Sequence, residues 1–497
     1  MDRAALEEER IEGRDLGRTI FRNTVAASIG SWFTRIANFL FIIFAVRTLG
    51  EVELGRYATV VAFVGLFSVF SELGMAQYVE RSIAQDHRRA QELFWNLVVL
   101  RAVLAVAGIT GISLLALGIY DEGLTLGIFI FSLTFLLSAL LVPLTVVLTA
   151  NERFDLSTAI SLIGQLVTVG LGLTLLWAGL GIYALLLTGF VAMPLQIITA
   201  AWLVRRFQLG RLPFRIDLSG WRSFIRASLP FGVTSLALTL NFNVDTVILG
   251  FFRPDADVGW YNASYRLIFN AVSIVGAFLV VMTPSLAREQ RLSPERVASW
   301  VRGSVYWMIV FAVPAGAGLS ALAPDTVALL YGDDFDAAGP IVAIIAWDIP
   351  FVVLLSLFGN VTAAIGRERP AAAIYVGSAA TNVLLNFAFI PLFGMYAAAS
   401  ITVLSDLITV GCFFVLLRDI LPLRPRLTPA LAQVGAATGL MVAALWLVPD
   451  LPLIPAIALG SAVYLGAAAV LRLFDVPATL SVLRVVLRRR RSERGVS

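Results

Sequence analysis

The chain has 497 residues, of which 59% are hydrophobic and only 14% are charged, and its mean hydropathy is +0.87. This composition excludes an ordinary soluble globule, so we expect a polytopic membrane protein. The net charge of +4 comes from 37 basic and 33 acidic residues, and because the basic ones are spread over loops, we expect no nucleic-acid partner.

Cysteine and histidine each occur once, as Cys412 and His87. A disulfide within one chain needs two cysteines, and common zinc motifs need several cysteine or histidine ligands. We therefore expect no disulfide, no metal site, no cofactor and no catalytic residue. The N-terminal sequence is polar and lacks the apolar stretch of a signal peptide, so we predict no cleaved leader.

The first predicted membrane helix, residues 22–47, carries an arginine inside its apolar sequence. Polar side chains recur there every three or four residues and so share one helix face: Thr24, Ser28, Ser31, Arg35 and Asn38. Arg35 is more than ten residues from either end of this span and so lies at least about 16 Å inside the helix at the α-helical rise, where exposing arginine to lipid costs about 2.5 to 17 kcal/mol. We therefore expect Arg35 to face protein or a water-filled cavity, and this helix to line a polar path across the membrane.

Further apolar segments of bilayer length follow at regular intervals, which predicts an all-α fold with fourteen transmembrane helices. The predicted spans are 22–47, 57–79, 93–118, 124–149, 156–178, 181–204, 225–251, 258–284, 299–323, 338–364, 370–390, 394–417, 428–448 and 453–474.

Charges on alternate loops support this count. One set of loops is rich in arginine, whereas the other carries mainly acidic residues, including Glu51, Asp121 and Asp255. The positive-inside rule then places both termini in the cytoplasm of a multi-pass protein of the cell membrane.

We divide the chain into a cytoplasmic tail (1–21), an N-lobe (22–204), an amphipathic linker (205–224), a C-lobe (225–417), two further helices (428–474) and a basic tail (475–497) that contacts membrane lipids.

An internal repeat supports the division into two lobes. Leu54-Gly55-Arg56-Tyr57 matches Val258-Gly259-Trp260-Tyr261, and Gly181-Ile182-Tyr183-Ala184 matches Gly394-Met395-Tyr396-Ala397. Because each half then contains six helices, the two copies run in the same direction, and we predict two parallel-repeat six-helix bundles related by an axis along the membrane normal.

Polar and ionisable residues within the predicted spans are the candidate functional groups. They include carboxylates suited to coupling transport to an ion, namely Glu72, Asp245, Asp348 and Asp406, and substrate-binding candidates, namely Arg35, Asn38, Arg266, Asn270 and Asn241. The alternative is that these groups form structural pairs between helices, for example Arg35 with Glu72 or Asp245 with Arg266. For Arg101, Asn382 and Asn386 we favour that structural interpretation.

The charges in the spans indicate the class of substrate. An arginine fork matches the oxygens of phosphate or pyrophosphate, whereas amides and aromatic rings suit sugars. A ligand with an anionic head and a long apolar tail would need a cavity that opens sideways to lipid.

The chain resembles the oligosaccharide flippases (Wzx-like, polysaccharide transporter family) of the multidrug/oligosaccharidyl-lipid/polysaccharide (MOP) exporter superfamily. The resemblance covers about the first 420 residues and rests on Phe33-Thr34-Arg35, Arg47-Thr48-Leu49-Gly50 with Leu54-Gly55-Arg56-Tyr57, Ser71-Glu72-Leu73-Gly74 and Gly394-Met395-Tyr396. It implies a V-shaped, MATE-like pair of bundles and a phosphate-contacting role for Arg35. The related lipid II flippases carry further basic residues along the first helix, where Phe41 and Ile42 stand here, which argues against lipid II as substrate.

These observations lead to one hypothesis and two alternatives. We expect a transporter rather than an enzyme: a flippase that moves polyprenyl-pyrophosphate-linked oligosaccharide to the outer leaflet by alternating access, driven by H⁺ or Na⁺. Its partners would include proteins of polysaccharide assembly. The first alternative is a MATE-type multidrug exporter, which would require acidic residues in its cavity to bind cationic drugs. The second is a membrane glycosyltransferase or ligase.

Overall fold

The computed structural model describes residues 3–207, 209, 214–269, 272, 294–421 and 427–473, with side chains from residue 36 onward except at 294–297 and 427–429. The α-helices are α1 (Arg3–Glu72), α2 (Met75–Gln85), α3 (Ala90–Leu117), α4 (Glu122–Ser132), α5 (Thr134–Ala150), α6 (Phe154–Trp177), α7 (Ile182–Arg206), α8 (Trp221–Phe252), α10 (Pro294–Ala321), α11 (Ala323–Tyr331), α12 (Ala338–Ile345), α13 (Ile349–Ala364), α14 (Glu368–Phe393), α15 (Met395–Leu416), α16 (Leu427–Trp446) and α17 (Leu453–Val470). A further helical segment covers residues 255–269.

The described part of the chain contains helices and no strand, which confirms the all-α membrane fold. Eleven segments are long and apolar enough to cross a membrane. The fourteen expected spans exceed that number for three reasons. One segment, Ile36–Glu72, contains the first two expected spans; Ala430–Trp446 is shorter than a full span; and the expected span 258–284 lies partly outside the described residues.

Helix α1 changes direction at Gly50. The segment Ile36–Glu72 has 37 residues, so a straight helix would be about 55 Å long, nearly twice the ~30 Å hydrocarbon thickness. Gly50 has φ 72° and ψ 177°, a combination that is essentially restricted to glycine. The chain therefore turns back across the membrane at Gly50 without the loop expected at residues 48–56.

The second predicted span, 57–79, is not one continuous helix as expected. Helix α1 ends at Glu72, and Leu73 and Gly74 have φ of 47° and 70° before α2 begins at Met75. A left-handed conformation is costly for leucine because its Cβ crowds the backbone. Packing against neighbouring helices must therefore hold this break in place.

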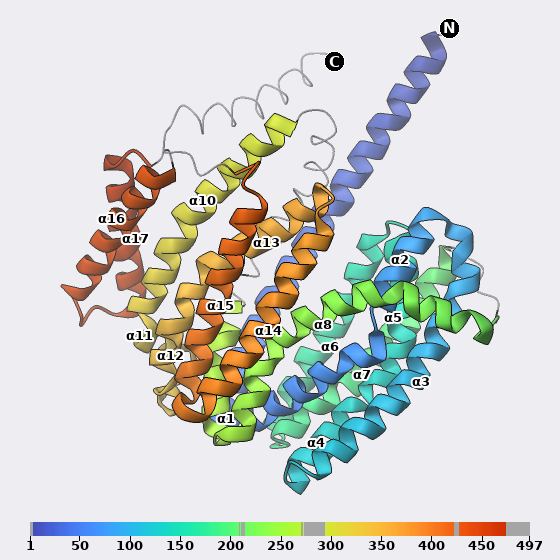
Figure 1. The fold of residues 1–497 in the computed structure, drawn as a ribbon, viewed down its shortest axis with the longest axis horizontal. Helices are drawn as coiled ribbons and strands as arrows, with labels where there is room; N and C mark the ends of the chain where they lie inside the picture. Colours follow the sequence, from blue (N-terminus) through green and yellow to red (C-terminus); the bar gives the residue numbers. More distant parts are fainter. Residues whose placement is uncertain are drawn as a thin grey trace.

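Two groups of helices lie side by side, and α8 runs from one group to the other (Figure 1). We call the group with α1 to α7 the N-lobe, and the group with segment 255–269 and α10 to α15 the C-lobe. Helix α8 joins both cores, because Phe224 packs with the N-lobe residues Val79 and Phe94, whereas Ile248 packs with Met395 of the C-lobe.

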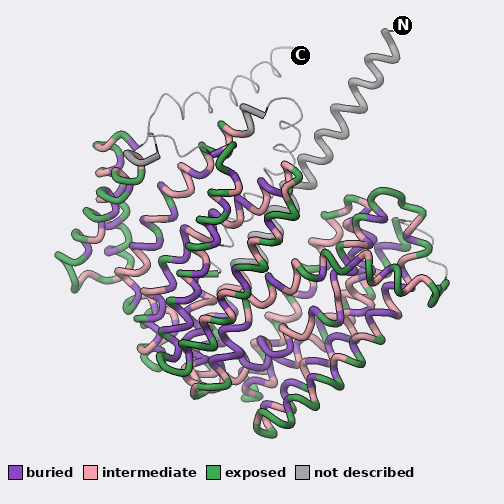
Figure 2. The backbone as a smooth tube through the Cα atoms, in the orientation of Figure 1, coloured by how far each residue is buried: buried purple, intermediate pink, exposed green. Residues whose placement is uncertain are grey.

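Helices α16 and α17 lie at the edge of the molecule, where they pack on α10 through Val310, Ala317, Val434, Met441 and Tyr464. Figure 2 shows many exposed residues on these two helices, whereas buried residues gather around α12 and α15. Exposed apolar side chains are expected on helices that face lipid.

The repeat seen in the sequence has a counterpart in the backbone. Gly181, which precedes α7, has φ 55° and ψ −137°, and Gly394, which precedes α15, has φ 60° and ψ −138°. Both values lie in a region that L side chains rarely adopt. The near-identical torsions at positions 181 and 394 therefore support the alignment of the two repeats.

We predict that Gly394→Ala lowers the free energy of unfolding in detergent by about 1–2 kcal/mol, the cost of a left-handed L residue. The added Cβ would also lie 3.1 Å from Nε of Arg253. Thermal unfolding of the purified protein measures the effect. Gly411→Ala in α15 is the control, because a Cβ at Gly411 meets no atom within 4 Å; an equal loss in both variants would contradict the argument.

Candidate functional site

The C-lobe contains a polar cavity of about 210 Å³. Its polar lining includes Asn241 of α8, Tyr265, Asp348, Asn382 of α14 and Asp406 of α15. Asp348 belongs to a 3-10 turn, Ala346–Asp348, that interrupts the span between α12 and α13. This turn is followed by Pro350 at the start of α13, and it places Asp348 in the same cavity lining as Asp406 of α15.

Several buried oxygens in and around this cavity lack a hydrogen-bond donor. They are Oδ1 of Asn241, Oδ1 of Asp348 and Oδ1 of Asn386. Asn386 itself donates to Asn382 at 2.9 Å. A buried acceptor without a donor is costly, so this arrangement can accommodate a proton or a cation that ligates oxygen. Among the described residues, no cluster of three His, Cys, Asp or Glu side chains suits a tightly held metal.

Asp245 lies beside this cavity and is 2% exposed. It accepts hydrogen bonds from the hydroxyl of Tyr261 and from the backbone N–H of Thr246. The Tyr261 hydroxyl also lies 3.3 Å from Oγ1 of Thr402 on α15. Tyr261 therefore takes the place beside Asp245 that the structural alternative gave to Arg266.

The candidate substrate-binding residues do not form one cluster. Oδ1 of Asn38 accepts a hydrogen bond of 3.3 Å from Gln165 of α6, inside the N-lobe. Arg266 of the C-lobe lies over the ring of Tyr57 of the N-lobe, with its Cζ 5.4 Å from the ring centroid. Asn241 lies with the acidic groups instead. The side chain of Arg35 and the whole of Asn270 lie outside the described residues.

Glu72, the remaining ion-coupling candidate, lies in the N-lobe near Arg101, whose Nη1 is 4.0 Å from Oε1 of Glu72. Arg101 is 4% exposed. The expectation that Arg101 has a structural partner is thus met by Glu72, and sequence reasoning named both residues without pairing them.

The two lobes come into backbone contact at the end of the molecule that carries Gly50, which we call the distal end. A Cβ added to Gly55 would lie 1.8 Å from the carbonyl oxygen of Asp255, and one added to Gly259 would lie 1.9 Å from that of Glu51. Only glycine permits an approach this close. The two glycines are the repeat partners found in the sequence, but their mutual contact could not be read from it.

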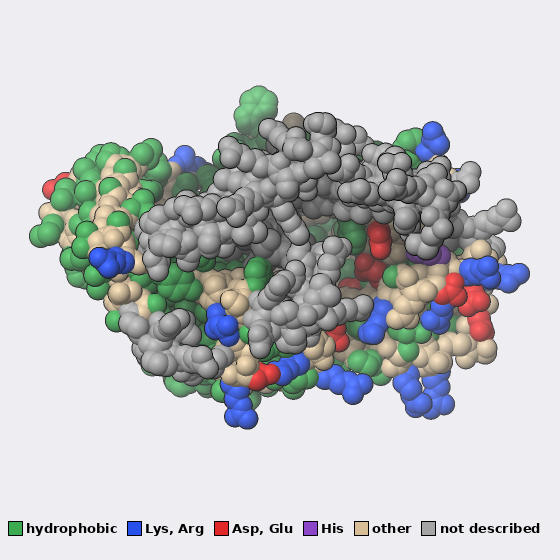
Figure 3. All heavy atoms as spheres, turned by 90° about the horizontal axis from the view of Figure 1, so that it is seen from above, with side chains coloured by type: hydrophobic (Ala, Val, Ile, Leu, Met, Phe, Trp, Pro, Cys, Tyr) green, Lys and Arg blue, Asp and Glu red, His purple; other side chains and the backbone are tan. Residues whose placement is uncertain are grey.

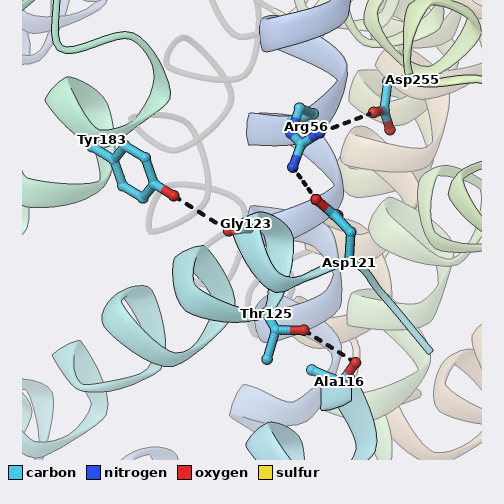
Figure 4. A network of polar contacts seen from close by, with 7 residues as sticks. All are labelled: Arg56, Ala116, Asp121, Gly123, Thr125, Tyr183 and Asp255. Atoms are coloured by element: carbon cyan, nitrogen blue, oxygen red, sulfur yellow. Dashed lines mark hydrogen bonds and ion pairs between the residues drawn. The ribbon is translucent and has the colours of Figure 1, made fainter. Parts of the chain in front are cut away.

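Charged side chains reinforce this distal contact (Figure 4). Arg56 bonds Asp121 of its own lobe at 2.6 Å and lies 3.8 Å from Asp255 of the segment that begins the C-lobe. Arg47 of α1 donates to the carbonyl oxygens of Leu329 and Leu330 at the end of α11, where a helix favours a cation.

The carboxyl groups of this contact have shifted pKa values. Burial tends to raise the pKa of Asp121, but the hydrogen bond and charge of Arg56 outweigh burial, and the pKa is lowered. The pKa of Asp255 is raised by burial and by the nearby charges of Asp121 and Glu53, against the effect of Arg56. Asp121 is thus the better partner of Arg56.

Residues 20–290 match the model of a family described as "Polysaccharide biosynthesis protein". The probable low-salt glycan biosynthesis flippase Agl15 of Haloferax volcanii is 21% identical over 391 residues, which cover 77% of this chain and 80% of the relative. Among solved structures, the lipid II flippase MurJ in an inward closed conformation superposes with a TM-score of 0.75 at 16% identity, covering 90% of this chain and 98% of that chain. An inward-facing multidrug resistance MATE family transporter of the MOP superfamily gives 0.59 at 12% identity, covering 78% and 94%. At these identities, the solved structures establish a shared fold.

We predict that Gly259→Ala separates the lobes at the distal end, because its Cβ would overlap the carbonyl oxygen of Glu51. The reporter is Ala263→Cys in a Cys412→Ser background, since Ala263 is fully buried among residues of both lobes, including Val46. A membrane-impermeant maleimide should label it several times faster in the Gly259→Ala variant. Gly303→Ala, whose Cβ would meet no atom within 4 Å, is the control. Unchanged labelling would contradict the role of this contact.

We also predict that Tyr261→Phe lowers the free energy of unfolding by about 1–3 kcal/mol, because a buried oxygen of Asp245 loses its donor. Tyr396→Phe serves as the control, because Tyr396 is 45% exposed and should be neutral. Both effects can be measured by thermal unfolding in detergent. Equal stability of the two variants would mean that the bond to Asp245 contributes nothing.

Proposed function

Because the chain belongs to the polysaccharide biosynthesis protein family, which its model matches over residues 20–290, we propose that it is a flippase for lipid-linked oligosaccharides. It moves a polyprenyl-pyrophosphate oligosaccharide from the cytoplasmic to the outer leaflet by alternating access, for the synthesis of surface polysaccharide. The similarity to a glycan biosynthesis flippase over most of both chains supports this proposal, as does the fold shared with a lipid II flippase.

The observation that carries the proposal is the position of Arg266 between the lobes. Arg266 lies eleven residues beyond Asp255 on its helix, about 16 Å from the distal contact at the α-helical rise, and it reaches across to Tyr57 of the N-lobe. An arginine placed at that depth between two lobes suits the diphosphate of a lipid carrier. The aromatic ring beside it suits a sugar face.

Arg35 and Asn270 are the further proposed substrate contacts, whereas Asn38 accepts a hydrogen bond from Gln165 inside the N-lobe. On α1, position 35 lies one and two turns before Phe39 and Ile42, on the same face. Ile42 packs against Ala263 and Leu267 of the C-lobe. The helix face that carries Phe39 and Ile42 therefore meets the C-lobe, and helical spacing puts position 35 on that face.

The proposed orientation puts the distal contact outside and the opposite end in the cytoplasm. Figure 3 shows that opposite end, where arginine side chains are spread over much of the described surface. This distribution follows the positive-inside rule and supports cytoplasmic termini. The structure then corresponds to a state closed to the outside, from which the distal glycine contact must separate to release the substrate.

The buried carboxylates supply the proposed coupling to H⁺ or Na⁺. Asp245, Asp348 and Asp406 gather in the C-lobe, where the donor-free oxygens of Asn241 and Asn386 favour a positive ligand. Glu72, the coupling candidate of the N-lobe, differs from these three because it is partly exposed and paired with Arg101. Binding and release of the ion in different states would bias the equilibrium between them.

A MATE-type multidrug exporter is the second candidate, because the same acidic C-lobe cavity would also suit a cationic drug. The two functions differ in their substrate: a flippase would bind an anionic lipid through the arginines between the lobes, whereas an exporter would bind a cationic drug through the acidic cavity. Drug susceptibility of a deletion strain distinguishes them: unchanged susceptibility with loss of surface glycan supports the flippase, and the reverse supports the exporter.

Arg35→Ala and Arg266→Ala should each reduce surface glycan export at least about tenfold, because a charge-assisted hydrogen bond contributes about 1.5–3 kcal/mol. Export is measured by complementation of a deletion strain, with the amount of protein in the membrane determined in parallel. The control is Arg302→Ala, because Arg302 of α10 donates to the carbonyl oxygen of Ile420 within the C-lobe. Normal export by the Arg35 or Arg266 variant would refute its assignment.

A further inference from the structure

The break after Glu72 lies at a meeting point of three helices. Glu72 ends α1, and Leu73 and Gly74 adopt left-handed torsions before α2 begins. A Cβ added to Gly74 would lie 2.2 Å from the backbone nitrogen of Gly232 on α8, and one added to Gly232 would lie 2.8 Å from the carbonyl oxygen of Leu73. The break is therefore held directly against the backbone of α8.

Helix α8 is the element on which a change at this break would act. Gly232 follows Pro230, which removes a hydrogen bond from the interior of α8. On one side of Pro230, α8 packs with the N-lobe through Phe224, and on the other side it packs with both lobes, through Val247 in the N-lobe and Ile248 in the C-lobe. The contact between the break and Gly232 thus lies just before the part of α8 that is held by both lobes.

Arg101 approaches the same break from α3. Its Nε and Nη1 are buried without a hydrogen-bond partner, and Glu72, 4.0 Å away, is the carboxylate paired with it among the described residues. Glu72 is less buried, with a side chain that is 33% exposed. A buried guanidinium requires a counter-charge. The position of the Glu72 carboxylate therefore depends on the charge of Arg101, and the position of Arg101 depends on the charge of Glu72.

We propose that Arg101 is a positioning residue for transport: through Glu72 it holds the break at Leu73–Gly74 against α8 and so stabilises the state seen here. This inference rests on the proposed function. Loss of the charge on Glu72 removes the attraction to Arg101, and the strain at Leu73 then favours a straighter helix that withdraws from Gly232. Arg101 does not touch the substrate, and it acts through the contact between the break and α8.

The chain offers a direct reporter of that contact. Nε2 of Gln77 on α2 lies 3.5 Å from Oγ of Ser235 on α8, one turn from the break. Cysteines at positions 77 and 235, in a Cys412→Ser background, can be joined by a short thiol-specific crosslinker in membranes. The yield of crosslinked protein measures how often α2 and α8 are in contact, without any transport assay.

Two kinds of variant should shift the yield in opposite directions. Glu72→Gln and Arg101→Met should each lower it at least threefold, whereas Arg101→Lys, which keeps the charge, should preserve it. Leu73→Gly should raise the yield, because glycine adopts the left-handed torsion without strain. Glu152→Gly is the matched control, since Glu152 has a φ of 59° in a turn outside this contact, and it should change nothing.

The double variant Glu72→Gln/Arg101→Met separates positioning from simple packing. Replacing a buried ion pair by neutral groups often preserves stability, so a purely structural pair predicts normal folding, normal crosslinking and normal export. The proposal predicts normal protein amounts but a lowered crosslinking yield and at least a threefold loss of export.

A crosslinking yield equal to that of the wild type in the single and double variants would overturn the proposal. If the wild-type protein exports no glycan while the crosslinking shifts occur as expected, the proposed function fails and the positioning role stands.

Discussion

The close approach of Gly55 and Gly259 is the constraint on which the arrangement of the two lobes depends. Each glycine faces backbone atoms of the opposite repeat at distances that exclude a Cβ. The charged contacts of Arg47 and Arg56 gather around this backbone contact, and they rely on the lobes already being adjacent. A pair of repeat-related glycines thus holds the lobes together at one end of the molecule, and a transporter that opens to one side at a time requires such a contact to form and to separate.

The two lobes differ in their charged residues: the C-lobe contains buried carboxyl groups, whereas the N-lobe contains a carboxylate paired with an arginine. In the C-lobe, Asp245 accepts hydrogen bonds from the hydroxyl of Tyr261 and the backbone N–H of Thr246, and Asp348 and Asp406 line one cavity; among the described residues, no ion pair joins these three to an arginine. In the N-lobe, Glu72 and Arg101 form a pair at a strained helix break. The acidic cavity suits a small cation or a proton, whereas Arg266, which lies between the lobes, suits an anionic head group. In the proposed mechanism, the separation of these sites lets ion and substrate act on one conformational equilibrium without competing for the same side chains.

Sequence reasoning predicted the elements better than their contacts. Apolar length and loop charge predicted the all-α membrane fold, because every backbone group in lipid must be bonded within a helix. The matched glycines at 55 and 259 were also found, but their mutual contact depends on how the lobes pack. Helical spacing gives the face of a residue and its depth, but not the neighbouring helix. For that reason Glu72 was not paired with Arg101, and Asn241 was grouped with Arg266 instead of with Asp348. The break at Leu73 could not be predicted from leucine's preferences, since tertiary contacts hold it against them.

The most direct test of the central claim is a flipping assay with purified protein in liposomes. A fluorescent polyprenyl-pyrophosphate oligosaccharide is placed in both leaflets, and an impermeant reductant bleaches the label that reaches the outer surface. The account predicts that the protein makes the inner-leaflet label accessible, and that the same oligosaccharide on an uncharged polyprenol stays protected because it lacks the diphosphate. Protection of the diphosphate-linked label in the presence of folded protein, with a proton or sodium gradient in either direction, would contradict the account.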